Sequence, residues 1–104
     1  MSMSTINEYD DLLCDAIAVW GERDQLDMVK EELNELAVAV SHWQRGRIEP
    51  ETVVDEMVDA MVMIAQLGII LDLPNVDIVF ERLLHKKMER LAERIAEARE
   101  PQDG

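Results

Sequence analysis

Five acidic residues stand in two short motifs at spacings that suit metal chemistry. Glu31, Glu32 and Glu35 lie within the stretch KEELNELAV, while Glu56 and Asp59 lie within the largely apolar stretch VDEMVDAMVMIAQL. Residues three apart share one face of a helix, so Glu32 with Glu35 and Glu56 with Asp59 form two carboxylate pairs. On two facing antiparallel helices, these pairs would converge on one pocket lined by oxygen atoms.

An ordinary solvated surface is the other interpretation of these acids. Glutamate is a good helix former, so the segment EELNEL taken alone is best explained as an exposed face. The second pair fits that explanation poorly, because Glu56 and Asp59 lie beyond the first turn of their helix and have no basic residue within four positions. Buried carboxylates without partners take up a proton or bind a cation. Taken together, the two pairs favour a metal site.

The side chains that accompany the acids indicate which metal. His42 and His85 do not lie three residues from any of these acids, so the Glu-x-x-His pattern of di-iron bundles is absent. A set of ligands made only of oxygen suits Mg²⁺ or Mn²⁺. Since Mg²⁺ leaves coordination positions to water and phosphate, the expected chemistry is metal-assisted attack of water on a phosphate chain.

A basic stripe near the end of the chain could contact such phosphates. Lys87, Arg90 and Arg94 share one face of a predicted helix, beside an apolar face. Arg90 and Arg94 are like charges four residues apart, which is mildly destabilising unless an anion lies between them. A solvated face paired with neighbouring glutamates is the alternative, and the pattern alone does not decide between the two.

Two tryptophans and a glutamine are candidates for contact with a nucleobase or sugar. Gln25 shares the helical stripe of Glu32 and can both donate and accept hydrogen bonds. Trp20 is a further candidate. Trp43 continues an apolar stripe, so we expect it to pack in the core.

Length and charge limit the classes of function. The 104 residues predict one domain over 1–104, with frayed ends at 1–4 and 100–104. A net charge of -13 argues against nucleic acid as a partner. Cys14 is the one cysteine, no secretory segment opens the chain, and no apolar run is long enough to span a bilayer. We therefore expect a cytoplasmic protein that does not bind membranes.

Apolar periodicity and helix-end signals predict an all-α fold of four helices. The apolar residues of the second helix recur in steps of three and four; this Leu stripe comprises Leu26, Val29, Leu33, Leu36, Val40 and Trp43. Glycine, proline and capping residues set the predicted bounds at 5–20, 23–45, 50–71 and 75–99. Short connections between long helices favour an antiparallel four-helix bundle.

The third predicted helix is apolar on nearly every side between residues 57 and 71. Such a helix is enclosed all round, which is difficult to arrange within one four-helix chain. We therefore expect a homo-oligomer, either a dimer or a tetramer.

The acidic motifs and their flanks resemble the MazG-like, all-α nucleoside triphosphate pyrophosphohydrolases. That family carries E-E-x-x-E and, after a variable spacer, E-x-x-D; here residues 31–35 and 56–59 match. The stretch WGERDQL is similar to the W-G-x-x-x-Q-L lead-in of small, often phage-encoded members, and KKMERLAERI is similar to their basic closing helix. The resemblance covers roughly residues 20–95. Met61 and Met63 depart from it, since many relatives have D-V or D-I-L after the second motif.

The resemblance implies roles for individual residues. Glu32, Glu35, Glu56 and Asp59 would be Mg²⁺ ligands, with Mn²⁺ as a substitute, and Glu31 would be an outer ligand or an aid in orienting water. The implied reaction converts an NTP or dNTP and water to the monophosphate and pyrophosphate, in housecleaning of the nucleotide pool. The alternatives are a pyrophosphatase specific for dUTP or dCTP, and a non-catalytic helical interaction protein with a vestigial metal site.

Overall fold

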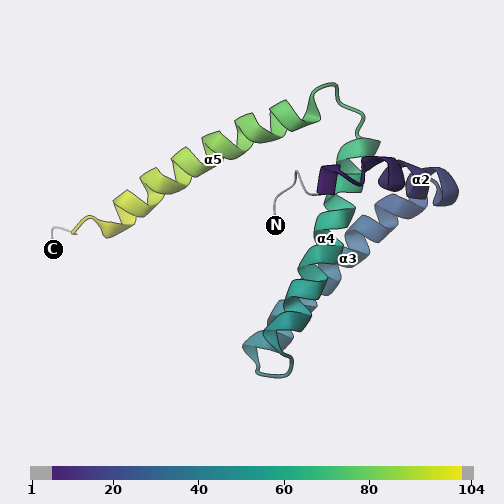
Figure 1. Ribbon diagram of the computed structural model, residues 1–104. Coiled ribbons are helices and arrows are strands. Elements are labelled where there is room, and N and C mark those ends of the chain that lie inside the picture. The colour runs from purple at the N-terminus through teal and green to yellow at the C-terminus, as the bar shows by residue number, and fades with distance from the viewer. Residues whose placement is uncertain (1–5, 102–104) are drawn as a thin grey trace. The chain divides into compact units, whose positions relative to one another are not determined.

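The computed structural model describes residues 6–101 of the chain. This part of the chain has no β-strand and forms four helices of 11 residues or more, α2 (Asp10–Trp20), α3 (Glu22–Gln44), α4 (Pro50–Ile70) and α5 (Val76–Arg99) (Figure 1). The all-α class and the four predicted helices are therefore confirmed. Their assembly into an antiparallel four-helix bundle stays a prediction.

The helices belong to two compact units. The first, Met1–Asp72, contains α2, α3 and α4, and the second, Leu73–Gly104, contains α5. The single domain expected over residues 1–104 stays a prediction.

Glycine and proline set the ends of the two long helices in the first unit. After α3, Gly46 has a φ of 71° and its N–H donates to the Trp43 carbonyl at 2.9 Å. The Arg47 N–H donates to the His42 carbonyl at 2.9 Å, which completes a Schellman motif. Pro50 begins α4, where its missing N–H costs no hydrogen bond. The predicted bounds of both helices are confirmed to within one residue at each end.

Two helix starts differ from the prediction. Residues 6 and 7 are helical and residues 8 and 9 form a turn, so the single helix predicted from residue 5 is interrupted and α2 begins at Asp10. The caps expected at Ser4 or Thr5 lie outside the described residues. Asn75 precedes α5 as expected, but its side chain makes no capping hydrogen bond. Its φ of 62° is left-handed, a conformation that asparagine tolerates better than most residues, so Asn75 supports a turn rather than a cap. Of the frayed ends expected at 1–4 and 100–104, residues 1–4 and 102–104 lie outside the described residues, while residues 100 and 101 follow the end of α5.

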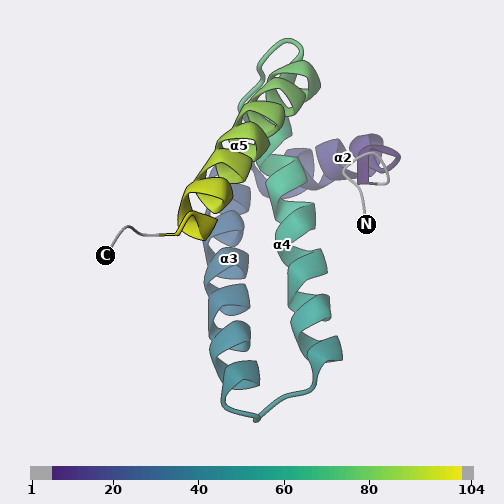
Figure 2. The ribbon, with the colours of Figure 1, turned by 90° about the vertical axis from the view of Figure 1, so that its left-hand side faces the viewer.

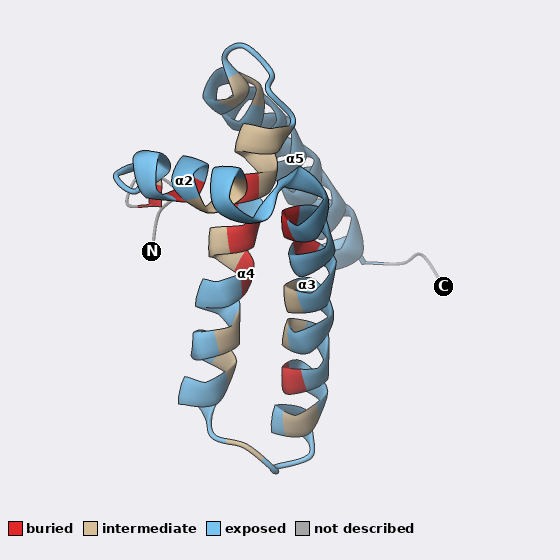
Figure 3. Ribbon diagram, turned by 90° about the vertical axis from the view of Figure 1, so that its right-hand side faces the viewer, coloured by how far each residue is buried: buried red, intermediate tan, exposed pale blue. Residues whose placement is uncertain are grey.

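The first unit is organised around an antiparallel pair, α3 and α4, which lie side by side (Figures 1 and 2). The ribbon is coloured buried or intermediate mainly on the facing sides of the two helices (Figure 3). On α3 this buried stripe comprises Gln25, Val29, Glu32, Leu36 and Ala39, and on α4 it comprises Val53, Glu56, Ala60, Met63 and Leu67. Steps of three and four keep each set on one helical face.

The Leu stripe was expected to be the buried face of α3, and this is wrong for most of its length. Val29 is buried, but Leu33 is 42% exposed and Trp43, expected in the core, is 49% exposed. The buried stripe is displaced from the Leu stripe by one residue, so that Gln25, Glu32 and Ala39 take the places expected for Leu26, Leu33 and Val40. The contact with α4 therefore leaves Leu26, Leu33, Val40 and Trp43 on its flank.

The hydrophobic core of the first unit is small. Leu13 of α2 lies with Ile6 and Ala65 in a buried cluster, against which Met61, Val62 and Ile69 of α4 pack. Among the described residues, no large side chain is completely buried. The core therefore lies where α2 crosses α4, and it leaves the far half of the α3–α4 pair to the acidic side chains.

Helix α4 keeps large apolar side chains exposed within the first unit. Val54, Met57, Val58 and Ile64 are all exposed. Within the first unit α4 packs against α2 and α3, which leaves these side chains uncovered, and the second subunit expected to cover them stays a prediction.

The second unit consists of one amphipathic helix. No residue of α5 is buried, and its apolar stripe comprises Phe80, Leu84, Met88, Leu91 and Ile95. His85 Nε2 lies 3.7 Å from Glu89 Oε1, one turn along the helix. None of the described helices combines the length and apolar character that a membrane span needs.

Candidate metal centre

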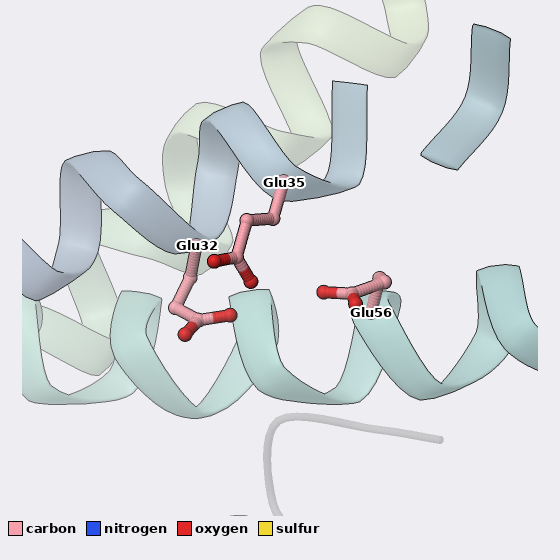
Figure 4. A group of neighbouring side chains, drawn as sticks. All are labelled: Glu32, Glu35 and Glu56. Carbon is pink, nitrogen blue, oxygen red and sulfur yellow. The ribbon is translucent and has the colours of Figure 1, made fainter. Parts of the chain in front are cut away.

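Three of the predicted ligands converge between α3 and α4. Glu32 and Glu35 extend from α3 and Glu56 extends from α4 toward a common space (Figure 4). One carboxylate oxygen from each residue can be chosen so that all three lie within 4.8 Å of one another. Separations of this size allow oxygen atoms on two helices to bind one cation.

Aspartates adjoin this group on the α4 side. Asp55, Glu56 and Asp59 form a second group whose ligand oxygens also lie within 4.8 Å of one another. Glu56 belongs to both groups and so connects them. Asp59 thus lies beside the predicted ligands, within the second group rather than the first. Asp55 was missed by the sequence analysis, although its place directly before Glu56 and four residues before Asp59 was a usable signal.

Burial distinguishes two of these acids. Glu32 and Glu56 are half-buried, whereas Glu35, Asp55 and Asp59 are exposed. Glu32 Oε2 and Glu56 Oε2 are shielded from solvent and, within residues 6–101, have no hydrogen-bond partner. A shielded carboxylate oxygen without a partner is costly, and a proton or a cation relieves that cost.

The negative charges of the cluster act on one another. Partial burial raises the pKa of Glu32 above its ordinary value, and the charges of Glu35, Asp59 and Glu56 raise it further. Partial burial likewise raises the pKa of Glu56, with further contributions from Glu35, Asp59 and Asp55. In the described part of the chain, no Lys or Arg forms an ion pair with any of these acids.

These residues fit a hard divalent cation. Every donor is a carboxylate oxygen, the type that Mg²⁺ and Mn²⁺ prefer, and two of the oxygens lack any other partner. Glu32, Glu35 and Glu56 would hold the ion, and Asp59 borders the same space. A cation there would also offset the mutual repulsion that raises the pKa of Glu32 and of Glu56.

The remaining predicted site residues lie outside the two carboxylate groups, in three different parts of the described chain. Glu31 is exposed and belongs to neither carboxylate group within the described residues. Gln25 is buried and Trp20 is exposed, and both line a pocket near the start of α3. The basic residues Lys87, Arg90 and Arg94 are exposed on α5, in the second unit, and their contact with phosphate stays a prediction.

Two hollows lie along the α3–α4 pair. One has a volume of about 370 Å³ and includes Glu35, His42, Thr52 and Glu56 in its lining, so it opens directly onto the carboxylates. The other has a volume of about 580 Å³ and lies toward the start of α3, where Trp20 is part of its lining. The first hollow therefore gives the cluster room for part of a ligand, and the second lies further along the same helix pair.

No protein family, curated protein or solved structure was found to match the chain.

Proposed function

We propose that the protein is a Mg²⁺-dependent nucleoside triphosphate pyrophosphohydrolase, which converts an NTP or dNTP and water to the monophosphate and pyrophosphate. The observation that carries this proposal is the convergence of Glu32, Glu35 and Glu56 from two facing helices, with their ligand oxygens within 4.8 Å of one another. The resemblance of the motifs that contain these residues to the MazG-like enzymes supports the same reaction.

The chain's own acids create the need for a cation. Residues 1–72 contain 16 of the 23 acidic residues but only four of the ten basic ones. A triphosphate alone would be repelled by this unit, so it would bind as a complex with metal. A bound Mg²⁺ would neutralise phosphate charge and lower the pKa of the attacking water.

Other side chains would complete the reaction. Glu31 would lie outside the ligand shell and would orient the attacking water. Lys87, Arg90 and Arg94 would stabilise the negative charge that develops on the departing pyrophosphate. Six of the ten basic residues follow residue 81, which makes this part of the chain the best source of such charges.

Single substitutions in the cluster test the proposal. We expect Glu35→Gln and Asp59→Asn each to lower kcat/KM by at least about 100-fold while helix content is unchanged, since each substitution removes a ligand oxygen charge. Glu51→Gln on α4 is the matched control, because Glu51 is exposed and belongs to neither carboxylate group among the described residues. Full activity in either cluster variant would refute the metal assignment.

We also propose that the protein is a homo-oligomer. Val54, Met57, Val58 and Ile64 expose apolar surface along α4, and the core that a single chain encloses is small. Soluble chains rarely leave so much apolar surface uncovered, and short chains often gain stability by association. A second copy of the chain would cover this side of α4.

A further inference from the structure

The hollow near the start of α3 has features that the metal chemistry does not use. It lies between the first turns of α3 and the second half of α4, with Trp20 from the end of α2, and its volume is about 580 Å³. Its lining comprises Trp20, Asp24, Gln25, Asp27, Met28, Met63 and Gln66. Below it is called the amide pocket.

Two buried glutamines set the polarity of the amide pocket. Gln25 is 7% exposed and Gln66 is 4% exposed, and they are the two buried polar residues among those described. Gln66 Oε1 has no hydrogen-bond partner within residues 6–101. An apolar residue would fill such a position at lower cost, so an unpaired amide in a pocket indicates a ligand that supplies the missing hydrogen bond.

The register of the helix pair connects the amide pocket to the acidic cluster. An antiparallel pair in which Glu35 opposes Glu56 also places Gln25 opposite Gln66, since each glutamine lies ten residues from its glutamate, toward the same end of the pair. The acids closest to the amide pocket along each helix are Glu32, seven residues from Gln25, and Asp59, seven residues from Gln66. At 1.5 Å per residue, the amides are about 10 Å along the groove from these acids.

The charges around the amide pocket exclude phosphate as its occupant. Asp24 and Asp27 belong to the lining, and the one described ion pair there joins Lys30 Nζ to Asp27 at 3.1 Å on the exposed surface. The available groups are amide and carboxylate acceptors, amide donors and methionine side chains. A neutral, planar ring with N–H groups on its edge matches this set.

Trp20 supplies a suitable surface for such a ring. Its side chain is 62% exposed although it lines the amide pocket. An exposed indole beside a pocket can stack on a heterocycle, and stacking on aromatic side chains is a common way of holding bases.

We infer that the amide pocket binds the nucleobase of the nucleotide whose phosphates lie at the acidic cluster, with Gln66 and Gln25 hydrogen-bonded to the base edge and Trp20 stacked on its face. This inference rests on the proposed function for the position of the phosphates. It adds Gln66, Met28 and Met63 to the substrate contacts, none of which the sequence analysis identified.

Affinity measurements on a pair of glutamine variants test the inference. In Gln66→Met the amide is lost while the side chain keeps a similar length, and Gln44→Met, at an exposed position, is the control. We expect Gln66→Met to weaken binding of the preferred nucleoside triphosphate with Mg²⁺ by about tenfold, the effect of losing one well-formed hydrogen bond. Its affinity for inorganic tripolyphosphate with Mg²⁺ should stay within about twofold of the unsubstituted protein, since that probe has no base.

Three further readouts separate a binding role from a structural one. Gln66→Met should keep or raise Tm, because it removes an unpaired buried oxygen, whereas loss of a structural glutamine would lower Tm. Trp20→Ala should weaken nucleotide binding and Trp43→Ala should not, although both tryptophans are exposed. Neutral nucleosides, titrated without metal, should shift the side-chain amide NMR signals of Gln25 and Gln66.

The outcomes distinguish this inference from the proposed function. Unchanged nucleotide affinity in both Gln66→Met and Trp20→Ala would overturn the amide pocket, even if pyrophosphate release were present. Binding of nucleosides that depends on Gln66, in a protein that releases no pyrophosphate, would support the pocket and refute the hydrolase. Absence of nucleoside and nucleotide binding would refute both.

Discussion

Glu32 and Glu56 differ from the other acids of the chain in what surrounds them. Each has one carboxylate oxygen that water does not reach and that, within residues 6–101, has no hydrogen-bond partner. Both acids lie among further carboxylates, so two unfavourable effects act on the same ionised groups. Ionised and without a cation, these residues destabilise the folded chain, which is a cost that functional sites commonly carry.

This cost predicts how stability depends on pH in the metal-free protein. The pKa values of Glu32 and Glu56 are raised above 4.5, so the folded chain binds more protons than the unfolded chain at pH values from 4.5 up to the raised values. Their contribution to the free energy of unfolding is therefore fully present below pH 4.5 and is lost as pH rises through the raised pKa.

Urea denaturation between about pH 5 and pH 7.5 checks this sign. The metal-free protein should lose stability with rising pH, and Glu32→Gln should show a shallower loss and a higher midpoint at the upper end. Saturating Mg²⁺ should restore the stability of the unsubstituted protein at the upper end of the range, because the ion binds the ionised acids. Identical pH profiles for the protein and Glu32→Gln would contradict the predicted repulsion.

Among the elements, the α3–α4 pair positions the site, and its turn was the part most readily predicted. Gly46 and Pro50 have restricted structural uses, so they gave the end of α3 and the start of α4 directly from sequence. The buried face of α3 was harder to predict. The Leu stripe and the buried stripe share Val29 and Leu36, and periodicity favours whichever stripe is more apolar, whereas the stripe that packs carries Gln25 and Glu32.

Some site residues, like the buried face of α3, could not be predicted from the pattern within one helix. Spacing identified Glu32, Glu35 and Glu56, because carboxylates three residues apart in a sequence remain neighbours in a helix. Gln66 could not be identified in this way, since its importance depends on its burial opposite Gln25 and on an oxygen without a partner. Such properties follow from packing between elements and are not visible in a single segment.

A pair of glycine substitutions tests the geometry of these elements. Gly46→Ala should reduce the free energy of unfolding by about 1 kcal/mol, because Gly46 has a φ of 71° that alanine adopts with strain. Gly68→Ala, inside α4, should raise it by about 0.5–1 kcal/mol, since alanine is the better helix former and its Cβ would meet nothing within 4 Å. Urea midpoints measure both changes, and equal effects of the two substitutions would contradict the assigned helix ends.

For the whole molecule, the amount of exposed apolar surface is the property that most requires explanation. The described core centres on three buried residues, Ile6, Leu13 and Ala65, while α4 exposes a series of large apolar side chains. The apolar character of residues 57–71 was visible in the sequence, but which sides one chain covers could be learned only from the packing of α2 and α3. The association that we propose would leave these side chains less hydrated.

Light scattering coupled to size exclusion tests this association. The protein should have the mass of a dimer or tetramer at micromolar concentration, and Met57→Glu should shift it toward the monomer, because a charge would be buried at the interface. Val19→Glu, at an exposed apolar position on α2, is the control and should leave the mass unchanged. A stable monomer in the unsubstituted protein would contradict association through α4.

The most direct test of the central claim is pyrophosphate release from a panel of canonical and modified NTPs and dNTPs, with Mg²⁺, with Mn²⁺ and with chelator. Pyrophosphate and phosphate would be separated, so that cleavage after the α-phosphate is distinguished from stepwise loss of phosphates. We expect pyrophosphate and monophosphate in equal amounts, only when a divalent cation is present. Folded protein that releases no pyrophosphate from any nucleotide with either metal would contradict it.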